Sequence, residues 1–241
     1  MIGSAAWAWL LAGLFGLCAG PAMAAVKAED YHAFWLWSGV RTQPVLNGAK
    51  TLYVLQGQVS APRNDAQAAT LIAQGMGVRR LPQPEVWIVY RAHTLHWPAP
   101  VYQQLLGQVQ RWQAAGNAIM GVQLDFDART RYLHEYVAFL QHFRQRLPAQ
   151  YKLSITGLMD WGSNADPHTL AQLNGLVDEV VVQTYQGRQS IEGYAAYLPR
   201  LGRMALPFKI GVVQGGEWHR PSPLEASPWF RGYVVFLQNG R

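Results

Sequence analysis

The feature that most constrains this chain is a series of short apolar segments, rich in β-branched and aromatic residues, that recur between helical or turn-like stretches. We predict strands at 31–38, 51–60, 85–92, 119–128, 152–161, 179–186, 208–215 and 232–238. Strands that alternate with helices form a parallel sheet, because each helix returns the chain to the same edge. Eight such strands in roughly 210 residues predict closure into a single, small (βα)8 barrel of TIM type.

The stretches between the strands carry helix signals. Residues 65–76 are rich in alanine, while 101–114 and 130–147 have apolar residues at helical spacing. Asp166 followed by Pro167 is typical of a helix N-terminus. The chain ends just after the eighth strand, so we expect the final covering helix to be absent or replaced. An open doubly wound sheet is the alternative.

The first two dozen residues predict a signal peptide. An apolar run at 5–17 is broken by Gly20 and Pro21, and Ala22-Met23-Ala24 gives the small-x-small pattern of a cleavage site. We therefore expect a signal peptide at 1–24, a barrel domain at 25–241, and a periplasmic or secreted protein. The run is too short to remain as a stable membrane span.

Composition and motifs exclude several classes of function. The net charge of +6 comes from scattered basic residues, with no run that would bind nucleic acid. The sequence Ser38-Gly39-Val40 after the first strand is not a dinucleotide-binding loop, and no phosphate-binding P-loop occurs. The histidines predict no metal site, so we expect neither metal nor cofactor. Nothing in the sequence fixes the oligomeric state.

The active site of such a barrel lies at the carboxyl ends of its strands. Carboxylates, amides and aromatic rings gather there, a mixture that suits a polyhydroxylated ligand better than a phosphate or a nicotinamide. The residues at these ends are Trp37, Ser38, Gln56, Gln58, Tyr90, Arg91, Asp125, Asp127, Asp160, Trp161, Gln183, Tyr185, Gln214, Glu217, Gln238 and Asn239.

The predicted fourth strand is the most informative. Because side chains alternate, Gln123, Asp125 and Asp127 share one face, and the apolar residues between them share the other. The apolar face must meet the helices, so the polar face points into the barrel. Two carboxylates held close together there should raise the pKa of at least one, as a general acid requires. A structural pair bonded to backbone amides or to Arg91 and Arg129 is the alternative.

Three segments carry a resemblance to a known family. Residues 121–128 (GVQLDFDA), 153–161 (LSITGLMDW) and 182–185 (VQTY) resemble the bacterial family called domain of unknown function 3142. The likeness runs from about Tyr31 to the C-terminus. That family is grouped with TIM-barrel glycoside hydrolases, so the resemblance implies a barrel of this type.

A more distant likeness is to the chitinase-type family 18 glycosidases. Their fourth strand reads Asp-Gly-x-Asp-x-Asp-x-Glu, and alignment of its Gly with Gly121 places Gln123 and Asp125 on the inner acids and Asp127 on the general acid. Asp127 is one methylene shorter than that Glu, and Gln123 replaces an acid. The likeness therefore favours a sugar-handling site more than chitinase chemistry.

The sixth strand of those enzymes reads Met-x-Tyr-Asp, where this chain has Gln183-Thr-Tyr185-Gln186. The resemblance implies that Tyr185 contacts the substrate.

A two-carboxylate glycosidase needs a second acidic residue near the first. Asp127 and Glu217 fall after the predicted fourth and seventh strands, where many barrel glycosidases place this pair. Asp160 is an alternative partner, and Glu217 is alternatively a solvated loop residue.

These observations predict an exported glycoside-hydrolase-like barrel that acts on a glycan of the envelope or surroundings. Asp127 would donate the proton, and Asp125 would tune its pKa. The expected sugar contacts are Gln123, Gln183, Tyr185, Asp160 and Arg91, with Trp37, Trp161 and Trp218 as stacking surfaces.

Two alternatives stay open. One is a glycan-binding barrel without catalysis. The other is a scaffold or interaction protein of an envelope or secretion system. An open groove over Asp125 and Asp127 favours sugar work, and a mouth plugged by loops favours the scaffold.

Overall fold

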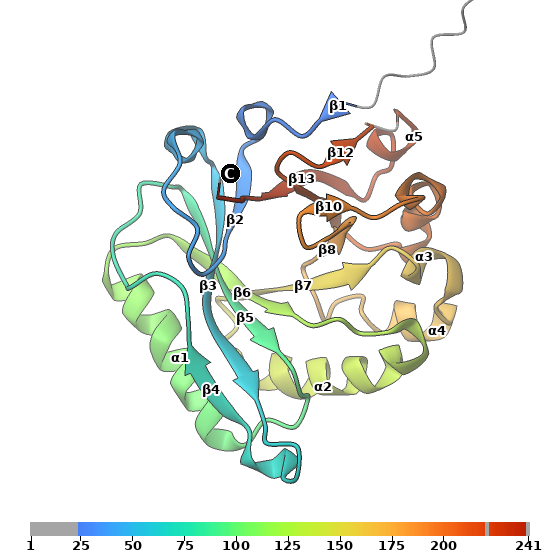
Figure 1. Ribbon diagram of the computed structural model, residues 1–241. Helices are drawn as coiled ribbons and strands as arrows, with labels where there is room; N and C mark the ends of the chain where they lie inside the picture. The colour runs from blue at the N-terminus through green and yellow to red at the C-terminus, as the bar shows by residue number, and fades with distance from the viewer. Residues whose placement is uncertain (1–23, 220–221, 240–241) are drawn as a thin grey trace, which may run out of the picture.

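Eight parallel strands close into a barrel in the computed structural model, which describes residues 24–219 and 222–239 (Figure 1). Around the barrel they are β2 (Ala33–Leu36), β3 (Thr51–Ser60), β5 (Glu85–Ala92), β6 (Ile119–Asp125), β7 (Lys152–Leu158), β8 (Glu179–Gln183), β11 (Phe208–Val213) and β13 (Phe230–Phe236). The sheet closes because β2 pairs with both β3 and β13. The predicted fold class is confirmed.

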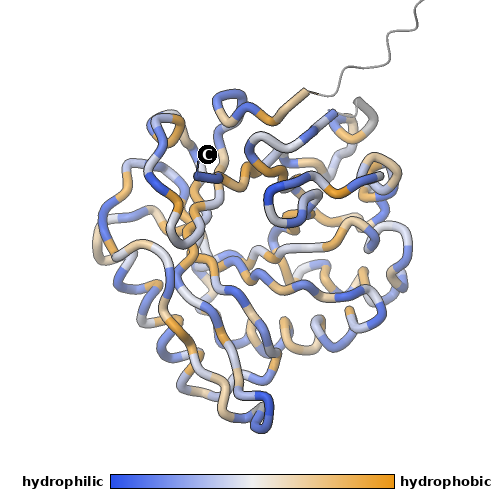
Figure 2. Tube along the Cα trace, in the orientation of Figure 1, coloured by the Kyte–Doolittle hydropathy of each residue, from blue (hydrophilic) through white to orange (hydrophobic). Residues whose placement is uncertain are grey.

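Side chains alternate along each strand between the barrel interior and the outer layer. A small interior cluster consists of Trp35, Tyr53, Leu55, Trp87, Val89, Val181 and Val234. A much larger cluster lies between the barrel and its outer layer, as the hydrophobic residues along the strands and helices indicate (Figure 2). Within the interior the rings of Tyr53 and Trp87 stack 5.9 Å apart.

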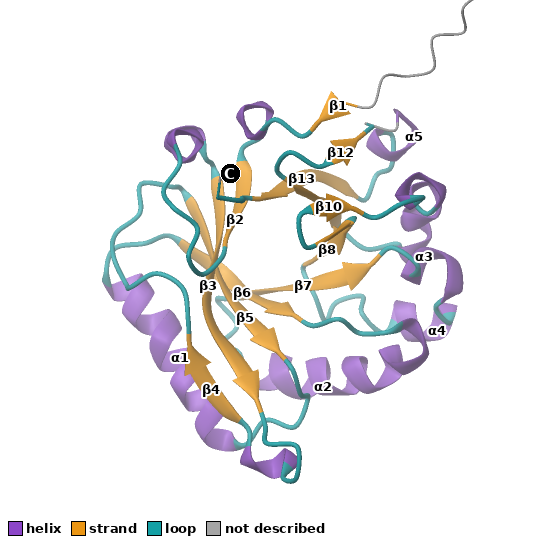
Figure 3. Ribbon diagram, viewed as in Figure 1, coloured by secondary structure: helices purple, strands orange, loops and turns teal. Residues whose placement is uncertain are grey.

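The outer layer is uneven (Figure 3). Two long helices, α1 (Ala99–Ala114) and α2 (Leu133–Arg146), lie outside the strands β5 to β7. Elsewhere the strands are covered by short segments. These are α3 (Trp161–Asn164), α4 (Pro167–Ala171), α5 (Ser222–Glu225) and the 3-10 helices Pro44–Gly48, Tyr194–Ala196 and Leu198–Met204. The predicted helix start is confirmed, since the Asp166 carboxylate accepts a hydrogen bond from the Thr169 amide.

The helix predicted at 65–76 is wrong. A short 3-10 helix, Ala66–Ala68, precedes a strand, β4 (Thr70–Ala73), which pairs antiparallel with the second half of β3. Pairing with a neighbouring strand, and not the local sequence, determines the structure of this segment. The neighbouring strand β2 pairs with only the first four residues of β3, so the far half of β3 has an open edge. The segment supplies the missing hydrogen bonds as a strand, although its alanines favour a helix.

Several predicted strands end too late. β6 stops at Asp125, where the next amide, that of Phe126, donates to the Thr156 hydroxyl at 3.1 Å and leaves the ladder. β7 stops at Leu158, and α3 begins with Trp161. β8 stops at Gln183, before a two-residue strand, β9 (Tyr185–Gln186). The residues that follow each strand therefore point in directions that simple alternation does not give.

The predicted signal peptide lies almost wholly outside the described residues, which begin at Ala24, so it stays a prediction. The first described element, β1 (Ala24–Ala25), pairs antiparallel with β12 (Glu217–Trp218). No helix in the described part of the chain combines the length and apolar character needed to cross a membrane.

A close backbone approach between β6 and β7 yields a test of the fold. A Cβ atom added to Gly121 would lie 1.9 Å from the Lys152 carbonyl oxygen, so Gly121→Ala must push the two strands apart. We expect a loss of about 3 kcal/mol in unfolding free energy. In Gly107→Ala on α1, the nearest atom is 3.7 Å away. This control should gain about 0.5–1 kcal/mol from helix propensity.

Urea unfolding followed by circular dichroism measures both variants. A Gly121→Ala protein as stable as wild type would contradict the tight pairing of β6 with β7.

Candidate functional site

A cavity of about 250 Å³ opens at the barrel mouth, at the carboxyl ends of the strands. Its lining includes six residues that the sequence had singled out: Trp37, Arg91, Asp125, Asp127, Gln183 and Tyr185. Gln186, Gly187 and Phe236 complete it. We call this space the mouth cavity. It combines two carboxylates, a guanidinium group, two amides and three aromatic rings.

Asp125 forms the floor of the mouth cavity and is 4% exposed. Its Oδ1 accepts a hydrogen bond from the Thr156 hydroxyl at 3.1 Å and a longer one from Gln183 Nε2 at 3.5 Å. Its Oδ2 lies 3.5 Å from Arg91 Nε in an ion pair. Burial raises the pKa of Asp125 to about 6, and the charge of Asp127 adds to this rise, while Arg91 and the two hydrogen bonds oppose it.

Asp127 lies beyond the end of β6 and is exposed. It lines the mouth cavity and also a neighbouring hollow of about 270 Å³ beside Phe126, Arg129 and Tyr132. The sequence predicts a raised pKa for at least one member of the pair. That raised pKa is found on Asp125.

Aromatic rings form one wall of the mouth cavity. Tyr185 stacks on Phe236 with ring centres 5.3 Å apart, and Trp37 meets Phe236 edge-on at 5.5 Å. The Arg91 guanidinium lies 5.6 Å from the centre of the Trp37 ring. Arg91 thus links this wall to the carboxylate on the floor.

Gln123 lies below the floor and is fully buried. Its amide accepts a hydrogen bond from the Trp35 indole and donates one to the Ser154 hydroxyl at 2.9 Å. With both ends of its amide engaged, Gln123 supports the site from within the barrel. The expectation that it contacts a sugar is corrected accordingly.

Two tryptophans expected as stacking surfaces are buried elsewhere. Trp161 is 0% exposed, packs against Gly157 and donates its indole N–H to the Ala128 carbonyl at 3.1 Å. Trp218 stacks on Tyr194 with ring centres 4.8 Å apart. Neither ring faces the mouth cavity, so neither can stack on a ligand held there.

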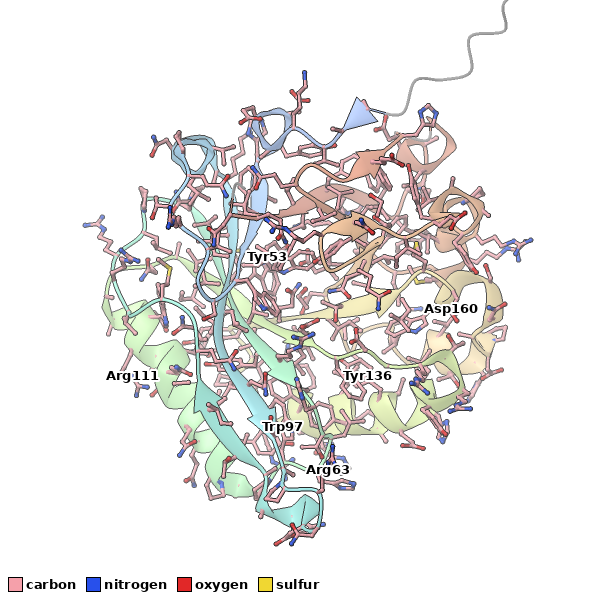
Figure 4. The ribbon with its side chains drawn as sticks, viewed as in Figure 1. Tyr53, Arg63, Trp97, Arg111, Tyr136 and Asp160 are labelled. Atoms are coloured by element: carbon pink, nitrogen blue, oxygen red, sulfur yellow. The ribbon has the colours of Figure 1, made fainter. Side chains whose placement is uncertain are left out.

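The two candidate partner carboxylates also lie outside the mouth cavity. Glu217 is exposed on β12, opposite Ala25 of β1. Asp160 sits at the start of α3, where it accepts a hydrogen bond from the Thr130 hydroxyl (Figure 4). The carboxylates that line the mouth cavity are therefore those of Asp125 and Asp127.

Sequence reasoning missed a polar chain inside the barrel. The Glu179 carboxylate accepts hydrogen bonds from Ser154 at 2.9 Å and Tyr53 at 2.7 Å, and it lies 3.0 Å from Lys209 Nζ. Lys209 also donates to the Tyr53 hydroxyl at 2.8 Å. The signal was present, because Glu179 shares its strand face with Gln183, two strand steps away.

The described residues contain no group of three or more histidine, cysteine, aspartate or glutamate side chains that could hold a metal ion.

Comparison with known sequences gives one family. Residues 93–196 match the domain of unknown function DUF3142. All three segments that carried the predicted resemblance lie within this range, so the resemblance is confirmed there. No curated protein sequence matches the chain.

A solved structure with a TM-score above 0.5 supports the fold. The xylanase and α-amylase inhibitor protein XAIP-I has a TM-score of 0.52 at 9% identity, over 85% of this chain and 92% of that one. The spore cortex-lytic enzyme SleL of Bacillus cereus gives 0.47 at 16%, over 76% of this chain and 50% of its own. The chitinase domain of CotE from Clostridium difficile gives 0.49 at 12%, over 80% and 66%. The chain thus spans half the length of SleL, about two thirds of the CotE domain and most of XAIP-I.

The raised pKa of Asp125 predicts how stability depends on pH. Its pKa rises from 3.8 to about 6 on folding, so the folded state binds the proton more tightly, and stability falls as pH rises between these values. Above pH 6 the ionised group costs about 3 kcal/mol. Asp125→Asn should therefore be more stable than wild type at pH 8, by up to that amount, and nearly equal at pH 4.

Urea unfolding at both pH values measures the difference. A variant less stable than wild type at pH 8 would show that the ion pair with Arg91 outweighs burial.

Proposed function

We propose that this protein is an exported glycoside-hydrolase-like barrel that binds a glycan of the envelope or surroundings in the mouth cavity and hydrolyses it there. The observation that carries the proposal is the mouth cavity itself, where a buried carboxyl and an exposed carboxylate lie beside an aromatic wall. Such a combination can hold a sugar ring and also supply a proton.

The lining residues divide the work of binding. The C–H face of a sugar ring packs against Trp37 or Tyr185, and Gln183 and Arg91 offer hydrogen-bond donors to its hydroxyl groups. XAIP-I, which has a similar fold, was solved in a complex with trehalose. That complex supports a sugar as the ligand of a barrel with this shape.

The acid chemistry rests on the two carboxyl groups as a pair. Below about pH 6 Asp125 holds a proton. Asp127 is the exposed member, so a proton from Asp125 passes to Asp127 and from there to the glycosidic oxygen as that bond breaks, which leaves Asp125 ionised. A water molecule then adds to the anomeric carbon, and the proton that it releases restores the pair.

This assignment predicts a pH profile. Turnover should fall by about tenfold per pH unit above pH 6, because Asp125 then loses its proton. Asp127→Asn should lower turnover by at least about 100-fold with folding intact. Release of reducing sugar from a panel of purified envelope and extracellular polysaccharides measures this. Glu217→Gln, outside the mouth cavity, is the matched control and should keep wild-type turnover. Unchanged turnover in Asp127→Asn would refute the role of this residue.

A specific observation favours a second candidate function, glycan binding without hydrolysis. Both oxygens of Asp125 already have partners, in Thr156 and Gln183 on one side and Arg91 on the other. Among the residues that line the mouth cavity, this leaves Asp127 as the one carboxylate without a side-chain hydrogen bond or ion pair, and so free to act on a ligand. Hydrolysis by the usual route uses two.

Binding can be tested apart from turnover. Trp37→Ala should weaken oligosaccharide binding by about fivefold or more, since stacking on an aromatic ring contributes about 1 kcal/mol or more. Isothermal titration calorimetry gives the affinity, and Tyr132→Ala, an exposed aromatic outside the mouth cavity, is the control. Binding without sugar release supports the second function. Absence of both binding and release would contradict both functions.

A further inference from the structure

A second cavity lies on the outer side of β2 and β3, and Trp37 is the one lining residue that it shares with the mouth cavity. Its volume is about 210 Å³. In the part of the chain that the structure describes, no long helix covers these strands, and the roof comes from the 3-10 helix Pro44–Gly48 and the segment between β4 and β5. Its lining consists of Leu36, Trp37, Val40, Arg41, Thr42, Leu46, Asn47, Leu52, Met76, Arg79, Leu81, Pro82 and Gln83. We call it the outer cavity.

The walls of the outer cavity are mainly apolar. Leu36 and Leu52 come from the barrel strands, and Leu46, Met76 and Leu81 come from the covering segments. An apolar cavity of about 150 Å³ is large enough for benzene. The outer cavity therefore has room for a single ring with a small substituent or for a chain of several methylenes.

The charge of the lining is entirely positive. Arg41 and Arg79 are exposed and belong to the lining, which contains no aspartate or glutamate. Within the described chain, neither guanidinium group has an ion pair or a side-chain hydrogen bond. Their backbones are fixed, since the Arg41 amide donates to Asn239 at 2.8 Å and the Arg79 carbonyl accepts from Asn117 at 2.9 Å.

Gln83 adds a polar feature to the wall. It is 7% exposed, and its Nε2 donates to the Leu46 carbonyl at 2.9 Å, which joins the two covering segments. Its buried Oε1 has no hydrogen-bond partner within the described residues. A buried acceptor without a partner is costly.

From these features we propose that the outer cavity binds a small free amphipathic carboxylate, with its apolar part among the leucines and its carboxylate between Arg41 and Arg79. Burial of the apolar chain against these walls favours binding, because it removes the chain from water. Two guanidinium groups without acidic partners provide the complementary charge, and guanidinium matches carboxylate geometry. This site lies on the other side of Trp37 from the mouth cavity and does not depend on the function proposed for that cavity.

Octanoate is the probe for the test. In the full-length protein labelled with ¹³C on methionine methyl groups, octanoate should shift the Met76 signal, which Met76→Leu identifies. The signal of Met204, buried elsewhere and 1% exposed, should stay in place. Calorimetry should give a dissociation constant below 1 mM, on the order of 0.1 mM. No shift of Met76 at 5 mM octanoate, a concentration about 50 times higher, would overturn the proposal.

Three variants separate the two parts of the recognition. Leu81→Trp fills the cavity and should abolish binding, whereas Ile72→Trp, on the exposed side of β4, should retain it. Arg41→Gln with Arg79→Gln should weaken octanoate at least tenfold and leave octan-1-ol binding unchanged. These arginines are exposed, so this variant keeps the test valid if Leu81→Trp does not fold, as circular dichroism would reveal.

Two outcomes would overturn the assignment. If Leu81→Trp and the arginine double variant both bind octanoate as tightly as wild type, octanoate binds outside the outer cavity. The second outcome is a protein that does not bind octanoate but sediments with vesicles that contain phosphatidylglycerol. If the arginine double variant no longer sediments with these vesicles, the occupant is a membrane lipid and not a free carboxylate.

Discussion

The position of the candidate site depends on the hydrogen-bonded chain that fills the barrel interior. Glu179, which is buried, forms an ion pair with the partly buried Lys209, and Tyr53, Ser154 and Gln123 extend the hydrogen bonds from it toward the mouth. Removal of one partner of a buried pair costs about 3–5 kcal/mol, because the other charge is left without compensation. The chain of bonds is therefore hard to open. A ligand that enters the barrel stops at the level of Asp125, and the site is confined to the mouth.

Asp125 lies at the boundary between this filled interior and the mouth cavity, and this position explains its raised pKa. It is buried like the groups below it, yet its ionic partner Arg91 has a side chain that is 41% exposed. Water screens a half-exposed guanidinium, so its attraction offsets only part of the cost of burying the carboxylate. The charge of Asp127 acts in the same direction as burial. The raised pKa of Asp125 thus follows from its buried position at the end of β6.

Alternation along the strands was enough to predict the barrel and the inward side chains of Gln123 and Asp125, because both follow from where apolar residues must be buried. It could not predict the strand at Thr70–Ala73, whose pairing depends on how short β2 is. Nor could it place Trp161, since a residue just after a strand can turn into the mouth or begin an outward-facing helix. Aromatic type alone does not distinguish these two paths. The same limit applies to Glu217, which an antiparallel pairing with β1 holds outside the mouth cavity.

Trp37 belongs to the lining of both cavities, and this has a physical consequence for the two proposed sites. In the mouth its ring lies 5.6 Å from the Arg91 guanidinium, which in turn lies 3.5 Å from Asp125. A ligand in the outer cavity that contacts the Trp37 ring is therefore connected to Asp125 through one intervening side chain, that of Arg91. If occupation of the outer cavity changes affinity at the mouth, a ligand at the mouth must change affinity in the outer cavity by the same factor. The coupling would act through the position of one ring, without movement of the barrel strands.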